Sequence, residues 1–305
     1  MTNQELKNKI IEAKKERDTV ILAHTYQDPD IIDIADVTGD SFFLSKKAKE
    51  LGSKRVVMCG VRFMAESVKI LSPETETVLP VDTATCPMAE QIAPERVRRF
   101  KKENPNTEVV AYINTTAALK AECDVCVTSS SAVKIVNKLK ADDILFIPDK
   151  HLGSYVKKSL PDKNIILWDG FCPVHAQLTK EDVLACKKEH PDAKFAVHPE
   201  SPEEVVELAD MVGATSEIIK YAKETDGEVI IGTERGVVDY LSLHEEKGER
   251  FIQLSPEKLC CEDMKKITLL DVYNAVIGTG GEVVELPEDL RKKALKSIER
   301  MLELG

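Results

Sequence analysis

The chain has 305 residues, 43% of them hydrophobic and 31% charged, and a formal net charge of −11. This length allows a large buried core and two or three domains. The acidic balance argues against a nucleic-acid partner, because phosphate binding needs a basic face. No run of about 18 apolar residues is present to span a membrane. The polar N-terminus lacks the apolar centre of a signal peptide, so we expect a cytoplasmic protein.

Short apolar, β-branched runs alternate with helical patterns along the chain. The runs predict strands within 19–25, 55–61, 76–82, 108–114, 143–149, 164–170, 194–200, 228–234 and 250–256. The helical patterns lie near 1–18, 29–37, 62–72, 129–140, 151–159, 202–210, 215–224, 236–247 and 287–305. This alternation predicts parallel sheets covered by helices on both faces, with right-handed crossovers.

A threefold repeat organises these elements. The strings AHTYQDPD, AYINTTAA and AVHPESPE place His24, Tyr112 and His198 at matching positions, 88 and then 86 residues apart. Self-similarity at a fixed period indicates a repeated structural unit. We therefore expect an α/β fold of three homologous αβα sandwich domains, with short parallel sheets, around a pseudo-threefold axis. The expected domains are 1–86 (with 265–305 packing back on it), 87–172 and 173–264.

The repeat also predicts where ligands bind. In open α/β sheets, ligands lie beyond the carboxyl ends of the strands. The polar residues expected at those ends are His24, Tyr26, Tyr112, Asn114, His198 and Glu200. Ser41, Ser129 and Thr215 repeat the steps of 88 and 86 residues and are expected at helix N-termini. Such termini favour an anion through their N–H groups and dipole.

Each repeat ends in a cysteine: Cys86, Cys172, and either Cys260 or Cys261. Cysteines in a cytoplasmic chain indicate metal binding or catalysis more often than disulfides, although small buried residues are the plain alternative. Three thiolates would be an unusual ligand set for zinc. In an iron–sulfur cluster they would leave one iron open to bind substrate as a Lewis acid. Spacing alone does not separate the two neighbouring cysteines.

The remaining cysteines are expected to be structural. Cys123 and Cys126 form a lone CxxC without a second pair, and Cys59 and Cys186 fall in a strand and on a helix.

Histidines and one glutamate complete the candidate set. His24, His175 and His198 lie at predicted strand ends and are either hydrogen-bonded core residues or functional groups. Glu200 is expected to be a general base with a raised pKa, the alternative being a helix N-cap.

These residues resemble the quinolinate synthase family over nearly the whole chain. The shared strings are HTYQ (24–27), GDS (39–41), CGVRFMAES (59–67), CPMAE (86–90), AYINTTAALKAECDVCVTSS (111–130), WDGFCPVH (168–175), HPE (198–200), GATSEI (213–218) and CxxMK (261–265). The resemblance implies three αβα domains with a [4Fe–4S] cluster held at their centre by three cysteines. It identifies these as Cys86, Cys172 and Cys261, because the family's third ligand stands three residues before a methionine, here Met264.

The resemblance also implies the substrate site. The implied substrate-binding residues are His24, Ser41, Tyr112, Ile113, Asn114, Ser129, His175, His198, Pro199, Glu200 and Thr215. The implied catalytic residues are Tyr26, Tyr112, His198 and Glu200, with Tyr26 as the proton-transfer tyrosine. Two positions depart from the family: Ala214 lacks a hydroxyl that is common there, and Arg62 stands where histidine is common.

By this resemblance the chain is a transferase of de novo NAD biosynthesis. It is expected to condense iminoaspartate with dihydroxyacetone phosphate into quinolinate, phosphate and water, with the open iron as Lewis acid for dehydration. The expected partners are these small molecules, without nucleic acid or membrane. A functional link to an aspartate-oxidising enzyme and a monomeric state are also expected. The alternatives are another [4Fe–4S] hydro-lyase acting on a hydroxy acid, a non-catalytic iron–sulfur sensor or carrier, and a solute-binding protein.

Overall fold

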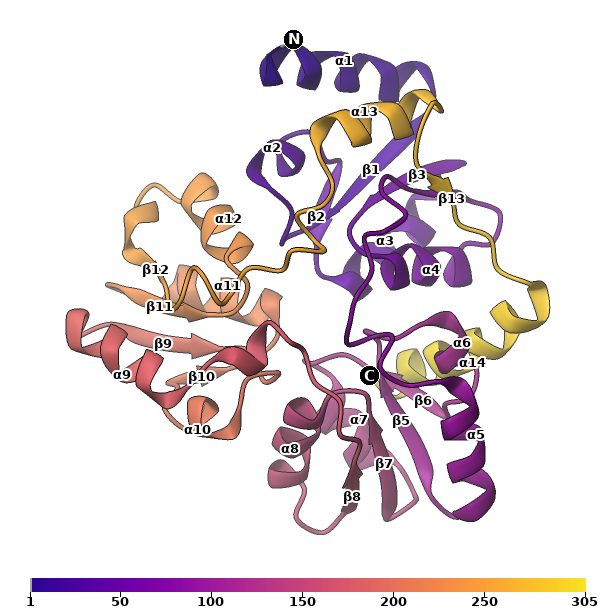
Figure 1. The fold of residues 1–305 in the computed structure, drawn as a ribbon, viewed down its shortest axis with the longest axis vertical. Helices are drawn as coiled ribbons and strands as arrows, with labels where there is room; N and C mark the ends of the chain where they lie inside the picture. Colours follow the sequence, from indigo (N-terminus) through magenta and orange to yellow (C-terminus); the bar gives the residue numbers. More distant parts are fainter. Residues whose placement is uncertain (1) are drawn as a thin grey trace. The chain divides into compact units, whose positions relative to one another are not determined.

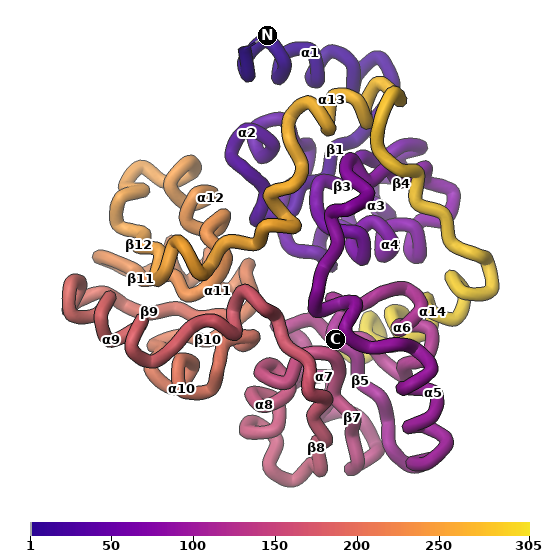
Figure 2. Tube along the Cα trace, in the orientation of Figure 1, coloured from indigo at the N-terminus to yellow at the C-terminus, as the bar shows by residue number. Residues whose placement is uncertain are grey.

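The computed structural model describes residues 2–305, and its strands form three sheets (Figures 1 and 2). The first sheet contains β1 (Thr19–His24), β2 (Val37–Gly39), β3 (Arg55–Cys59), β4 (Glu76–Leu79) and β13 (Glu282–Val283). The second contains β5 (Glu108–Tyr112), β6 (Val125–Val127), β7 (Asp143–Ile147) and β8 (Asn164–Leu167). The third contains β9 (Lys194–Val197), β10 (Met211–Val212), β11 (Val229–Gly232) and β12 (Phe251–Gln253). We call the elements of each sheet the first, second and third repeat.

The three sheets share one strand order. It runs β2-β1-β3-β4 in the first, β6-β5-β7-β8 in the second and β10-β9-β11-β12 in the third, with every pair parallel. Among the strands of residues 2–305, β13 alone runs antiparallel, on the outer edge of β4. In this order the first strand of each repeat lies beside the point where the winding reverses direction, the usual ligand position of such sheets.

Helices cover the sheets. Those of the first repeat are α1 (Asn3–Glu16), α2 (Pro29–Ile32), α3 (Ser41–Leu51) and α4 (Arg62–Leu71), and α13 (Leu269–Ile277) packs on α1. Those of the second are α5 (Pro94–Glu103), α6 (Ala117–Lys120), α7 (Ala132–Lys138) and α8 (Lys150–Ser159). Those of the third are α9 (Lys180–Glu189), α10 (Glu203–Val206), α11 (Thr215–Glu224) and α12 (Gly236–His244). Two short 3₁₀ turns, η1 (His175–Gln177) and η2 (Gly248–Arg250), and the C-terminal α14 (Glu288–Leu304) complete the fold.

The first sheet illustrates the layering. The pair α1 and α13 lies on one face and the pair α3 and α4 on the other (Figure 1). Buried Ile21, Leu22 and Val57 of the central strands fill the space between them. Continuous burial on both strand faces is what a parallel sheet covered by helices requires, so the predicted αβα architecture is confirmed.

The chain divides into two compact units. One comprises the residues up to Cys86 together with Cys261–Lys292, and holds the first sheet. The other comprises Pro87–Cys260 and Lys293–Gly305, and holds the second and third sheets. The expectation that all of 265–305 packs on the first domain therefore differs from this division, because the end of α14 contacts the second repeat. There Ser297 Oγ donates to the Lys120 carbonyl over 3.1 Å.

The same aspartate joins the first two strands of every repeat. In the first, the Asp36 carboxylate accepts the Ile21 N–H over 2.8 Å, and the Asp36 N–H donates to the Ile21 carbonyl. Asp124 with Val109 and Asp210 with Phe195 repeat both bonds. A side chain that satisfies a strand N–H substitutes for a missing ladder bond, so this aspartate fixes where the second strand begins.

A lysine from the preceding helix holds each aspartate. Lys14 of α1, Lys101 of α5 and Lys187 of α9 pair with the three aspartates over 2.9, 2.6 and 3.9 Å. The sequence carries this signal as the string KKE at 14–16, 101–103 and 187–189. The repeat therefore starts one helix earlier than the strand-centred strings indicate.

All nine predicted strands are confirmed, but the short edge strands β2, β6 and β10 and the added β13 were not predicted. The helix expected near 29–37 ends at Ile32, because the chain turns at Asp36 to pair with β1. Likewise, the helix expected at 202–210 ends at Val206 before β10.

Candidate active site

The first strand of each sheet ends in the polar residues that the sequence predicts there. His24 is the last residue of β1, Tyr112 is the last of β5, and His198 directly follows β9. Tyr26, Asn114 and Glu200 each stand two residues further on. Within its own repeat, every one of these residues lies at the carboxyl end of the sheet.

The backbone of its own loop orients the His24 ring. This residue is 4% exposed, and the Tyr26 N–H donates to its Nδ1 over 3.1 Å. The Tyr26 ring stands edge-on to it, with centroids 4.4 Å apart and planes at 78°. A neutral imidazole whose Nδ1 accepts a hydrogen bond carries its proton on Nε2. The geometry therefore makes His24 Nε2–H a donor, suited to an anionic oxygen.

His198 repeats this arrangement in the third repeat. Its Nδ1 accepts the Glu200 N–H over 3.3 Å. Burial lowers the pKa of His198 to about 4, so the ring is neutral at neutral pH and its proton also lies on Nε2. The first and third repeats thus each present a histidine Nε2–H donor from the same loop position.

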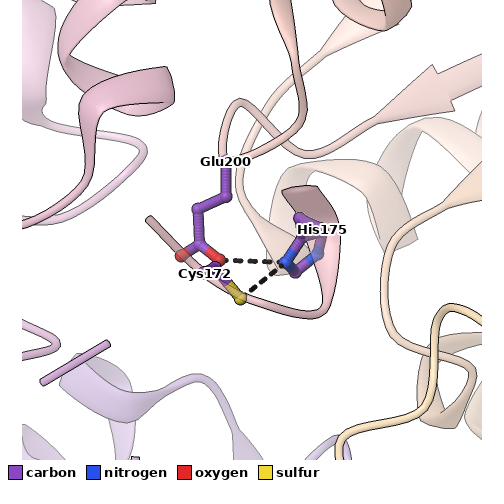
Figure 3. Close-up of side chains that lie close together, drawn as sticks. All are labelled: Cys172, His175 and Glu200. Atoms are coloured by element: carbon purple, nitrogen blue, oxygen red, sulfur yellow. Dashed lines mark hydrogen bonds and ion pairs between the residues drawn. The ribbon is translucent and has the colours of Figure 1, made fainter. Parts of the chain in front are cut away.

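His175 joins Cys172 to Glu200 in the second unit (Figure 3). Its Nδ1 lies 3.3 Å from Cys172 Sγ and 3.0 Å from Glu200 Oε2. Its Nε2 lies 2.9 Å from Thr233 Oγ1. The His175 and His198 rings are 5.0 Å apart, and both side chains are buried. A partly exposed thiol, a buried imidazole and a buried carboxylate therefore converge on one point.

The pKa of Glu200 is lowered, so the expected raised pKa is wrong. Burial alone would raise it, but the His198 and His175 rings and a hydrogen bond from the Tyr112 side chain outweigh burial. The alternative of an N-cap is also not seen, since α10 begins after Pro202 without a side-chain cap. Glu200 is instead an ionised carboxylate inside the site.

Asp149 is a site residue that the sequence analysis missed. This fully buried side chain accepts the Cys172 N–H over 3.0 Å and the Leu152 N–H over 2.7 Å, so it ties Cys172 to the start of α8. Burial and the nearby Glu200 raise its pKa well above the ordinary value. The available signal was an acidic residue at the carboxyl end of a predicted strand.

The predicted anion positions are at helix starts in two repeats. Ser41 is the first residue of α3, and Thr215 is the first residue of α11. Ser129 instead lies in the turn before α7, where Thr128 and Ser131 bond to each other. Implied site residues Ile113 and Pro199 lie in the loops that follow β5 and β9.

Ala214 is the N-cap of α11 and offers no side-chain acceptor to the first turn. We expect Ala214→Ser to stabilise the chain by about 1 kcal/mol, because an N-cap hydroxyl accepts a backbone N–H of that turn. Urea denaturation of the two proteins measures this difference. An unchanged or lower midpoint with the same slope would contradict it.

One backbone hydrogen bond recurs before each candidate cysteine ligand. The pairs are Arg62 N–H to Ala84 carbonyl (2.9 Å), Lys150 N–H to Gly170 carbonyl (2.8 Å) and Arg235 N–H to Leu259 carbonyl (2.8 Å). Cys86, Cys172 and Cys261 each stand two residues after the acceptor. Cys260 is one residue out of this register, so the equivalence favours Cys261 as the third member.

The other cysteines have the surroundings of structural residues. Cys59 lies in β3 and Cys126 in β6, and burial raises the pKa of both thiols. Burial likewise raises the pKa of Cys123, whose Sγ contacts the Leu119 carbonyl at 3.0 Å. A thiol that resists ionisation is a poor metal ligand.

Within the first unit, the loop after Cys261 is bonded to the N-terminal segment at three successive residues. Gln27 Nε2 donates to the Met264 carbonyl over 2.7 Å. Lys265 Nζ donates to the Tyr26 carbonyl over 2.7 Å, and Lys266 Nζ to the Thr83 carbonyl over 2.8 Å. The loop that carries Cys261 is thereby tied to the loops that carry Tyr26 and Cys86.

Arg62 has a local role in the same unit. Its guanidinium donates to Glu282 of β13 over 3.0 Å and to the Asp82 carbonyl over 3.0 Å. Together with the bond from its N–H to Ala84, these contacts hold the segment that leads to Cys86.

Known proteins of one family are similar to this chain over nearly its whole length. The sequence model of the quinolinate synthetase A protein family matches residues 8–303. The chain belongs to the quinolinate synthetase A family. It is 48% identical over 300 residues to the quinolinate synthase of Clostridium kluyveri, covering 98% of both chains. It is 46% identical to that of Alkaliphilus metalliredigens and 47% identical to that of Caldicellulosiruptor bescii, each over 100% of both chains.

Family membership confirms the resemblance drawn from the sequence strings. Among residues 2–305, no helix combines the length and the hydropathy that a membrane span requires.

Proposed function

We propose that this chain is a quinolinate synthase, a transferase that condenses iminoaspartate with dihydroxyacetone phosphate into quinolinate, phosphate and water in NAD biosynthesis. The observation that carries the proposal is the family match over residues 8–303 with relatives of that name. The polar ends of the three first strands support it, since a dicarboxylate and a phosphate ester need several donors. We further propose a monomeric, cytoplasmic enzyme supplied by an aspartate-oxidising enzyme.

We propose Cys86, Cys172 and Cys261 as ligands of a [4Fe–4S] cluster. The donor set fits, because all three are partly exposed thiols that follow the same backbone bond. When bound, the cluster would supply an open iron as a Lewis acid for the dehydration.

Substrate anions would be held by neutral donors. His24 and His198 carry Nε2–H groups, and Ser41 and Thr215 stand at helix starts where backbone N–H groups point outward. Tyr112, Ile113, Asn114, Ser129, His175 and Pro199 complete the proposed substrate-binding set. Neutral donors stabilise a carboxylate or phosphate without an ion pair that would slow product release.

Proton transfers would fall to Tyr26 and Glu200. Glu200 is an ionised acceptor with the Tyr112 side chain and His175 as hydrogen-bond partners. Tyr26 is half-buried, and its ring is oriented by His24. A positioned acid and base contribute roughly 10²–10⁴-fold each to such steps.

Anaerobic purification, iron and sulfide analysis, and an assay for quinolinate together test the proposal. Four irons with quinolinate formation supports it. A cluster with dehydration of a hydroxy acid but no quinolinate would favour another hydro-lyase, and a cluster without turnover would favour a sensor. An iron-free, inactive protein would remove the cluster proposal.

Lys266 is expected to position the cluster ligands, because its Nζ ties the Cys261 loop to the Thr83 carbonyl. Lys266→Met should speed iron release to a chelator several-fold while costing about 1–2 kcal/mol of stability, because the exposed Nζ also pairs with Asp263 over 2.6 Å. Lys293→Met on exposed α14 is the control. Equal rates of iron release in the two variants would contradict a role for Lys266 in positioning the Cys261 loop.

A further inference from the structure

The point where Cys172, His175 and Glu200 meet has the composition of a site for a single metal ion. One donor atom from each lies within 4.8 Å of the other two. The distances of 3.3 Å from His175 Nδ1 to Cys172 Sγ and 3.0 Å to Glu200 Oε2 are close to the edges of a zinc coordination tetrahedron. With bonds of about 2.0 Å to nitrogen and oxygen and about 2.3 Å to sulfur, those edges are about 3.3–3.5 Å.

Each donor already has an outer partner. Thr233 Oγ1 contacts His175 Nε2, Asp149 accepts the Cys172 N–H, and the Tyr112 side chain bonds to Glu200. Histidine ligands usually donate their second ring N–H to such a partner. A hydroxyl can both donate and accept a hydrogen bond. The Thr233 hydroxyl can therefore bond to Nε2 of either His175 tautomer, the one protonated on Nδ1 or the one protonated on Nε2. The ring can therefore expose a bare Nδ1 to a metal without moving.

Charge also favours a divalent ion. The side chains of His175 and Glu200 are 3% and 4% exposed, so a bare charge there is costly. A thiolate and a carboxylate together neutralise one M²⁺, with the thiol proton released to solvent. The mixed sulfur, nitrogen and oxygen set suits zinc, with one position left for water.

We propose that the cluster-free chain binds one zinc-type divalent ion through Cys172, His175 and Glu200. The donors all belong to the second unit, so this site does not require Cys86 or Cys261. Where the proposed function holds, an ion bound here would withhold Cys172 from the cluster.

Titration of the full chain, purified without its cluster under anaerobic conditions, with Co²⁺ tests this site. We expect one Co²⁺ per chain, with the intense visible bands of tetrahedral cobalt and a thiolate-to-cobalt charge-transfer band. Cys172→Ser should lose the charge-transfer band, and His175→Ala and Glu200→Gln should weaken binding at least tenfold. Zn²⁺ should displace the Co²⁺.

Cys86→Ser and Cys261→Ser separate this site from a metal held by the three cluster cysteines. Both variants should keep the stoichiometry and the charge-transfer band, as should the buried-cysteine control Cys126→Ser. Loss of the band in Cys86→Ser or Cys261→Ser would overturn the proposal, as would the absence of cobalt binding to the parent chain. Because these variants are expected to lack the cluster, cobalt binding by them is independent of quinolinate formation.

Discussion

Cys261→Ser is expected to abolish cluster binding and quinolinate formation together. The loop of Cys261 is fixed on both sides. Before it, the Arg235 N–H donates to the Leu259 carbonyl; after it, the Met264 carbonyl accepts from Gln27 and Lys266 donates to the Thr83 carbonyl. Serine would occupy the same place, but its hydroxyl does not ionise near neutral pH and is a poor ligand for iron. Iron and sulfide content after anaerobic reconstitution measures the loss.

Cys260→Ser is the matched control, because it makes the same replacement of sulfur by oxygen at the neighbouring residue. It should keep a full complement of iron and at least half of the activity, since Cys260 lies one residue out of the register shared by Cys86 and Cys172. Circular dichroism of both variants checks that the fold is retained. The reverse pattern, with iron lost only in Cys260→Ser, would overturn the choice of Cys261.

The central strands could be predicted to a large degree, because a buried parallel strand is a continuous apolar run. The edge strands β2, β6 and β10 could not be predicted, because two or three residues are too few to show a hydrophobic periodicity. Their positions depend on a bond between distant residues, such as that of Asp36 with Ile21. A polar side chain that replaces a ladder bond is invisible to hydrophobic patterning.

The candidate site divides in the same way. The positions of His24, Tyr112 and Glu200 follow from the rule that ligands bind at the carboxyl ends of parallel strands. Their charge states do not, because a pKa depends on which groups face each other in space. The pKa of Glu200 moves opposite to the expectation because the His198 ring attracts the carboxylate and His175, which precedes β9 in the sequence, bonds to it. Asp149 was missed for the same reason.

The three repeats share their backbone framework but differ in the polar residues that follow their first strands. The bonds of Asp36, Asp124 and Asp210 and those before the cysteines are identical in type, so the backbone framework repeats. The polar residues near the ends of the first strands are not identical. Tyr26, Asn114 and Glu200 occupy the equivalent position in the three repeats.

Tyr26→Phe is expected to keep the iron content but to lower kcat by at least about 10²-fold, the usual contribution of a positioned proton donor. The substitution removes one hydroxyl and nothing else from the loop. The backbone N–H that donates to His24 Nδ1 remains, as does the aromatic ring, whose centroid lies 4.4 Å from that of the imidazole. The bond from Lys265 to the Tyr26 carbonyl also remains, so the Cys261 loop stays in place.

A selective fall in kcat with little change in KM would therefore assign the effect to the hydroxyl. Steady-state kinetics with both substrates, together with iron analysis, provides the measurement. Tyr155→Phe, which removes the same hydroxyl from α8, controls for a general cost to stability. If Tyr26→Phe turned over as fast as the parent, the proton would have to come from another group. Glu200, whose carboxylate is hydrogen-bonded to the Tyr112 side chain, would be the next to test.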